Sequence, residues 1–268
     1  MRPDIPSSPQ PRSAVTDFTV DHGPADLLAT VFLRAENAIR SMGVQVSTGT
    51  LEELAEVNAA HRDSWLPLFP IYQPECWPGD DVANTYCLLG RDDSGRVVTT
   101  VALRNYHWPA STFHEEATSL RLFYGDPPRF RRPDERCTVT ATAARRIGGR
   151  VALAGAFWIH PDRRGGQQLP RLMGALIQSH CIAKWNVDAY TVMMSDSVFK
   201  RGLAKKCAWG NVDWAVELHD CLFGNLNLCF IWLTRAEILQ DLSKFLVELG
   251  PQTHGVVGQH GTEQHLRP

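Results

Sequence analysis

Two arginines and two glycines occupy residues 163–166, between an apolar run that ends at Ile159 and a predicted helix with Pro170 in its first turn. The first turn of a helix leaves main-chain N–H groups without acceptors and carries partial positive charge, so phosphate binds well there. The glycines let a ligand approach the backbone closely, and the arginines add forked, charged donors. The loop therefore predicts an anion site whose donors are the amides of residues 165–169, although a solvated surface turn has the same composition.

The apolar run before this loop, residues 151–159, predicts a strand that is buried on both faces. Gly155 lies in its interior, and an isolated glycine in a strand often marks a bulge or a close approach of another group. A bulge at this point would free the amide of Ala156 or Phe157 to bind a ligand carbonyl. One continuous stretch of chain would then contact both an amide-rich tail and a phosphate, which is the shape of coenzyme A.

The rest of the chain supplies the elements that must position this stretch, and hydrophobic periodicity and capping signals locate them. In the first half of the chain we expect a helix over 25–43, a short strand over 44–48, a helix from 51 that ends at the prolines 67 and 70, a hairpin over 84–106, and a helix near 111–125. In the second half we expect two strands around 145–149, a helix over 169–184, a strand over 187–195, a helix over 196–209, strands over 212–219 and 226–233, and a last helix to about 249. This order predicts a mixed α/β (α+β) fold, with a central sheet of about seven strands flanked by helices.

Composition limits the classes of function. The chain has 268 residues, 44% of them hydrophobic, and a formal net charge of -2, so no overall field attracts it to nucleic acid or to a membrane surface. Seven cysteines without a C-x-x-C pair fit a reducing cytoplasm, and ten histidines show no metal-ligand spacing. We expect a disordered segment over 1–24, a single domain over 25–249 and a disordered tail over 250–268.

The segment "IHPDRRGGQQLPRLM" (159–173) resembles the central motif of the GCN5-related N-acetyltransferase (GNAT) superfamily. That motif is a strand, a loop of the form R/Q-x-x-G-x-G/A and a helix with paired leucines. The positions that match are Ile159, Pro161, Arg164, Gly165, Leu172 and Met173. Gln167 and Leu169 stand where the family has its second and third glycines, so the chain resembles a divergent member.

A weaker resemblance follows the next predicted strand, in "SVFKRGLAKKCAW" (197–209). Leu203 matches the family pattern, and Ser197 stands at the position of its asparagine. Ala204 stands where many members have a tyrosine that protonates the departing thiolate, so this chain lacks that acid or supplies it from elsewhere. The resemblance covers residues 83–233, with the helices of 25–70 on the acceptor side.

The resemblance implies an acyl-CoA-dependent N-acyltransferase that moves an acetyl group, or a longer acyl group, from coenzyme A to a primary amine of a small molecule or peptide. It implies no metal, and a homodimer is among the arrangements expected. The residues expected to contact acetyl-CoA are Phe157, Trp158, Ile159, Arg164, Gly165, Gly166, Gln167, Gln168, Leu169 and Ser197. The candidates for chemistry are Ser195, which closes the strand after the helix, and Glu217, on the polar face of a later strand.

Several alternatives stay open at this point. The histidines at 107, 160 and 219 are weaker candidates for a general base, and the tryptophans at 65, 77 and 108 either line an acceptor pocket or pack in the core. An acyl-homoserine-lactone or N-acyl amino acid synthase would use acyl carrier protein, with the basic residues of 129–136 as a docking patch. A catalytically silent acyl-CoA-binding module is the third possibility.

Overall fold

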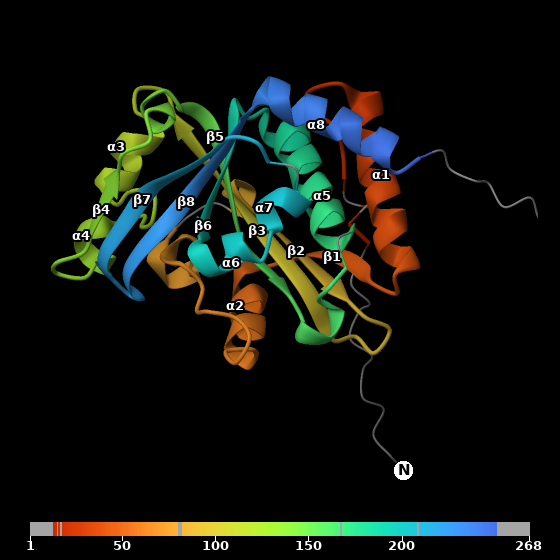
Figure 1. The fold of residues 1–268 in the computed structure, drawn as a ribbon, viewed down its shortest axis with the longest axis horizontal. Helices are drawn as coiled ribbons and strands as arrows, with labels where there is room; N and C mark the ends of the chain where they lie inside the picture. Colours follow the sequence, from red (N-terminus) through yellow and green to blue (C-terminus); the bar gives the residue numbers. More distant parts are fainter. Residues whose placement is uncertain are drawn as a thin grey trace, which may run out of the picture.

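The computed structural model describes residues 13, 14, 16, 18–79, 82–166, 168–207 and 209–250. In these residues one sheet of eight strands runs through the molecule in the order β1-β2-β3-β5-β6-β8-β7-β4 (Figure 1). The strands are β1 (Gln45–Gly49), β2 (Thr85–Arg91), β3 (Val97–Trp108), β4 (Arg136–Val139), β5 (Gly149–Ile159), β6 (Ala189–Ser195), β7 (Val212–Cys221) and β8 (Gly224–Thr234). The mixed α/β class is therefore confirmed, with eight strands where about seven were expected.

The centre of the sheet contains its one parallel pair among the described strands, β5 with β6, and the other neighbours are antiparallel. A parallel pair needs a crossover, and α5 (Gln168–Trp185) supplies it. The pairing of β5 with β6 covers only four positions, from Val151 opposite Ala189 to Ala154 opposite Val192. Beyond these positions β5 stays with β3 and β6 stays with β8, so the two central strands part.

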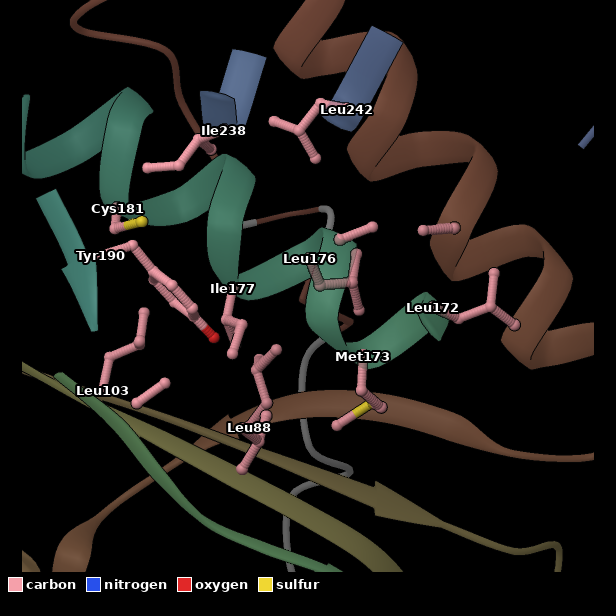
Figure 2. Packing of buried hydrophobic residues seen from close by; sticks show 14 of the residues in the cluster. Leu88, Leu103, Leu172, Met173, Leu176, Ile177, Cys181, Tyr190, Ile238 and Leu242 are labelled. Atoms are coloured by element: carbon pink, nitrogen blue, oxygen red, sulfur yellow. The ribbon is translucent and has the colours of Figure 1, made fainter. Parts of the chain in front are cut away.

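Long amphipathic helices cover one face of this sheet. Helices α1 (Ala25–Ser41), α5 and α8 (Arg235–Glu248) lie together there (Figure 1). Figure 2 shows Ile177 of α5 above Leu88 of β2 and Leu103 of β3, and all three side chains are almost fully buried. Each such aliphatic side chain contributes about 1.5–3 kcal/mol when it is removed from water. This layer holds α5, and hence the loop at its start, firmly against the sheet.

Short elements cover the opposite face: α2 (Leu51–Ala60), α3 (Phe113–Thr118), α4 (Pro127–Phe130) and single 3-10 turns, among them Pro70–Tyr72. Their core is more aromatic, with Tyr72, Trp108 and Phe113 buried in one cluster. Thr112 and Glu115 form a capping box on α3, which settles where that helix begins.

Three predicted helices are shorter than expected. The helix expected near 111–125 is α3, which ends at Thr118, and Leu120 beyond it has a φ of 64°, which a helix does not continue through. Helix α2 ends at Ala60 and does not continue to the prolines, because the buried amide of Asn58 accepts from the Leu68 N–H and donates to the Leu66 carbonyl, which folds the chain back. The helix expected over 196–209 is divided into α6 (Asp196–Lys200) and α7 (Leu203–Lys206). Gly202, with φ of 79°, takes a left-handed conformation that interrupts the helix.

The two expected disordered ends lie largely outside the described residues, which begin at Ser13 and end at Gly250. The described part of the first segment packs on the domain: Phe18 stacks on Phe32 at 3.9 Å between ring centroids, and the Ala14 N–H donates to the Val46 carbonyl. Within the described residues, none of the helices combines the length and apolar character needed to span a bilayer. All seven cysteines are buried and unbridged.

The stack of His180 in α5 on Tyr86 in β2, at 3.4 Å between ring centroids, predicts a pH dependence of stability. Burial lowers the pKa of His180 from 6.5 to about 3, so the unfolded chain takes up this proton first as the pH falls. Stability from this residue is complete above pH 6.5 and is lost progressively as the pH falls towards 3. Between pH 6 and pH 4 we expect the unfolding free energy of His180→Phe, measured with urea, to fall less steeply than that of the wild type, by about 1 kcal/mol per pH unit. Equal slopes for the two proteins would contradict the assignment.

Candidate functional site

A cleft of about 1000 Å³ opens where β5 and β6 part. Its floor comes from residues 153–159 of β5 and 192–195 of β6. One side is the loop that follows β5 together with the segment of α6 and α7, and the other is the loop after α2 together with the tip of the β7–β8 hairpin. The cleft thus brings together segments that are more than 100 residues apart in the chain.

The β5 floor contains the bulge predicted from Gly155. Thr100 of β3 lies opposite Trp158, and Ala102 lies opposite Gly155, so Ala156 and Phe157 together face a single β3 residue. Ala156 has a φ of 49°, and its carbonyl accepts a hydrogen bond of 2.8 Å from the Thr100 hydroxyl. Neither Ala156 nor Phe157 is paired with the described strands on either side. A bulge of this kind leaves main-chain polar groups free of the ladder.

Gly155 itself is required by a close neighbour. A Cβ at this position would lie 2.6 Å from Cε2 and 2.8 Å from the hydroxyl of Tyr72. The Tyr72 hydroxyl donates to the Leu153 carbonyl at 3.0 Å, which holds the ring against β5 at the point where the strands part. Burial raises the pKa of Tyr72 well above its usual value, so this phenol stays protonated.

The loop after β5 presents free amides to the cleft. Gly165 and Gly166 line it, and within the described part of the chain neither amide has a main-chain acceptor. A Cβ at either glycine would meet no atom within 4 Å. Of the other residues predicted here, Gln168 begins α5 and is exposed, Leu169 is buried in the core, and Gln167 lies outside the described residues.

Arg164 has a different role from a free anion ligand. Its Nε donates to the Ile159 carbonyl at 2.8 Å, and its Nη2 donates to the Ser64 carbonyl at 3.0 Å. The guanidinium therefore joins the end of β5 to the loop after α2, while its charge still faces the cleft. Arg163 is turned away from the cleft and donates to the Met42 carbonyl at 3.3 Å.

The charge of the described cleft lining is strongly one-sided. Four cationic side chains line it, from Arg62, Arg164, Arg201 and Lys206, against the single carboxylate of Asp63. Arg201 and Lys206 come from α6–α7, beside the loop of 163–166, so positive charge gathers on the side with the free amides. The sequence analysis missed these two residues, because basic residues in a short helix are usually solvated.

The two candidates for chemistry are placed differently. Ser195 lines the cleft at the end of β6, and its Oγ lies 3.1 Å from the Oγ of Ser197, which also lines the cleft. Glu217 is exposed on β7, with the Thr138 hydroxyl at 3.5 Å and His219 Nε2 at 3.4 Å, and it is not part of the cleft lining. The structure therefore brings Ser195 to the site and leaves Glu217 apart from it.

The aromatic candidates are also separated. Trp65 lines the cleft and stacks on Trp158 at 5.3 Å between ring centroids. Trp77 and Trp108 are outside the lining; the first donates its indole N–H to the Pro70 carbonyl and the second is buried. Tyr72, which follows the predicted end of the helix at Pro70, was not singled out from the sequence.

The contact between Gly155 and Tyr72 generates a stability prediction. Gly155→Ala should destabilise the protein by about 1–3 kcal/mol, because the new methyl group overlaps a ring that its hydrogen bond holds in place. In a Tyr72→Ala background the same substitution should cost less than about 1 kcal/mol, because the obstructing ring is gone.

Urea unfolding of the four proteins in this double-mutant cycle measures the coupling. Gly174→Ala in α5 is the matched control, since its Cβ would meet only Cys207 Sγ, at an ordinary 3.8 Å. That helical substitution should stabilise by a few tenths to about 1 kcal/mol. Equal costs of Gly155→Ala with and without the Tyr72 ring would show that the close approach is not what selects glycine.

No protein-family model matches this sequence, and no curated protein matches it. Solved structures similar to the chain include mutant forms of the spermidine/spermine N-acetyltransferase SpeG from Vibrio cholerae, with a TM-score of 0.43 and 7% identity over 74% of this chain and 98% of that one. Another is yncA, a putative acetyltransferase from Salmonella typhimurium with its cofactor acetyl-CoA, with a TM-score of 0.37 and 9% identity over 72% and 94% of the two chains. The first of these is named an N-acetyltransferase and the second a putative acetyltransferase. With TM-scores below 0.5, they carry no argument about the activity of this chain.

Proposed function

We propose that the chain is a GNAT-like N-acyltransferase that transfers an acetyl group, or a longer acyl group, from acyl-CoA to an amine. The observation that supports this most is the parting of β5 from β6 at a bulge, with free loop amides at the far end of the same strand. One strand and its loop would then offer both kinds of contact that coenzyme A requires.

The residues present fit the cofactor. The amides of Gly165 and Gly166, at the start of α5, suit the diphosphate, because a helix start combines free N–H groups with partial positive charge. Arg201 and Lys206 add charge beside them, and the volume of about 1000 Å³ accommodates an extended ligand. Four further predicted residues line the cleft and stay in the proposed cofactor site: Phe157, Trp158, Ile159 and Ser197. The side chains of Gln168 and Leu169 do not line the cleft, so these two residues would contribute only their main chain.

When bound, acetyl-CoA supplies an activated thioester. The contribution of the chain is alignment and polarisation: the amides of Ala156 and Phe157, which have no partner residue in the strand register, would donate to a carbonyl oxygen, and such fixed donors act most strongly where water is excluded. Ser195 and Ser197 share one hydrogen bond and keep further donor and acceptor capacity towards the cleft. Ser195 remains the proposed polar group for chemistry, and Glu217 is not included because it lies outside the cleft lining.

The carrier-protein alternative receives less support. The basic patch proposed for it, residues 129–136, runs from the end of α4 to the start of β4 at one edge of the sheet (Figure 1). None of these residues lines the cleft. Within that patch Glu135 is buried and accepts from the Tyr124 hydroxyl at 2.8 Å, which is a structural role.

A charge placed in the loop tests the cofactor site. Gly166→Asp should raise the dissociation constant for coenzyme A by about tenfold or more, because a carboxylate then faces the diphosphate among the free amides. Gly166→Asn is the isosteric control and should change binding by less than about threefold, since the backbone there is not in a left-handed conformation and a Cβ meets no neighbour. Isothermal titration calorimetry measures both variants.

This titration, together with an assay of thiol release, separates the three candidate functions. Unchanged affinity in Gly166→Asp would remove the loop from the cofactor site. Tight binding of acetyl-CoA by the wild type without thiol release in the presence of any amine would support a silent binding module. Thiol release only when an acyl carrier protein replaces coenzyme A would support the synthase alternative.

A further inference from the structure

We propose that the acceptor is an amine that carries an aromatic ring and no second positive charge, and not a polyamine. This inference rests on the proposed function and names the substrate class for the same cleft. It comes from the wall of the cleft opposite the loop of 163–166, called here the acceptor wall, which consists of residues 62–69 after α2 and of Phe223 and Leu226 in the β7–β8 hairpin.

From Trp65 onwards the acceptor wall is aromatic and apolar. Trp65 stacks on Trp158 at an interplanar angle of 12°, and Phe69 lies 4.9 Å from Phe223, ring centroid to ring centroid. Leu66, in the same wall, is 63% exposed, so its side chain adds apolar surface that a ligand can cover. An aromatic substituent would cover this apolar surface and stack against rings that are already fixed by their neighbours.

The charge of the lining opposes a polycation. Asp63 is the single carboxylate among the described lining residues, and Arg62 precedes it directly in the same wall. A polyamine carries several ammonium groups. In the cleft each of them would lose its hydration, either to apolar side chains or close to the four cationic residues that repel it. Because no further carboxylates in the described lining compensate for this loss, binding of a polyamine is unfavourable, and the cleft discriminates against such acceptors.

The titratable groups of the cleft agree with this acceptor. No histidine is among its described lining residues. His61 and His160 both pack on the Trp158 ring, at 4.6 Å and 5.7 Å between ring centroids, and neither lines the cleft. In the transfer, the amine nitrogen forms a bond to the acyl carbon, the carbon–sulfur bond breaks, the nitrogen releases its proton to solvent and the thiolate gains one from solvent. An arylamine is unprotonated at neutral pH, so it attacks without a general base to deprotonate it first. An aralkylamine such as phenethylamine is largely protonated there and reacts through its unprotonated fraction, which grows as the pH rises.

The acceptor class can be measured with three probes and acetyl-CoA as donor. Thiol release at pH 8 is followed for 4-methylaniline, phenethylamine and spermidine. We expect kcat/KM to be at least about tenfold higher for each aromatic amine than for spermidine, the size of discrimination that one apolar contact surface provides.

A variant pair tests whether the wall causes the preference. Leu66→Glu places a carboxylate in the acceptor wall at an exposed position, so the fold should tolerate it, and it should raise the spermidine to phenethylamine ratio of kcat/KM by about threefold or more. Val247→Glu is the matched control, because Val247 is 81% exposed on α8 and is not part of the cleft lining, and it should leave the ratio unchanged.

The outcomes separate this inference from the proposed function. Spermidine turned over as well as the aromatic amines would overturn the acceptor class and leave acyl transfer standing. An unchanged ratio in Leu66→Glu, or the same change in Val247→Glu, would overturn the role of the acceptor wall. Binding of acetyl-CoA without turnover of any of the three amines would overturn the proposed function and this inference with it.

Discussion

The short pairing between β5 and β6 is the constraint on which the rest of the molecule depends. Four residues of each strand hold together, and the bulge at Ala156 then turns β5 away while β6 continues with β8. Opening a sheet in its middle exposes main-chain groups that normally pair, and such groups are costly to bury without partners. The sheet tolerates the opening because its neighbouring pairs on both sides are long and antiparallel.

The two covering layers have different tasks in keeping this opening in place. The layer of α1, α5 and α8 is built from closely packed aliphatic side chains, and it fixes the start of α5 relative to the strands. The opposite layer is made of short elements and aromatic rings, of which Tyr72 is wedged at the parting of the strands through its contact with Gly155. The loop of 163–166 is thus attached to the closely packed layer of long helices. The acceptor wall belongs to the opposite layer of short elements and loops, where recognition surfaces are common.

Local signals in the sequence predicted the parts of the site that one segment builds. The glycine inside an apolar strand predicted the bulge, and the pair of glycines before Pro170 predicted the loop, because both depend on backbone geometry close to the residue concerned. The division of α6 from α7 also has a local cause, in Gly202, but a glycine within a helical pattern is too common to predict a break by itself. The early end of α2 depends on hydrogen bonds from the Asn58 side chain to the main chain of Leu66 and Leu68. Hydrophobic periodicity carries no information about such bonds, so this helix end could not be predicted from it.

The residues that meet only in the folded chain could not be predicted. Tyr72, Phe223 and Arg201 lie in three segments of ordinary composition, and only the sheet order brings them to one cleft. Glu217 lies outside the cleft lining, and the sequence could not show this, because an alternating strand has a polar face without telling which cavity that face meets. Strand order in a mixed sheet is a long-range property, so side chains contributed by distant strands need the coordinates.

The bridging guanidinium of Arg164 has a consequence for how this chain can change over time. It holds the Ile159 carbonyl through Nε and the Ser64 carbonyl through Nη2, so it serves the two halves of the cleft at once. A lysine would keep the positive charge but has no planar fork with which to reach both oxygens. Substitution at this position is therefore restricted by the shape of the side chain more than by its charge. A substitution that removed the guanidinium would remove the hydrogen bonds to both halves of the cleft at the same time.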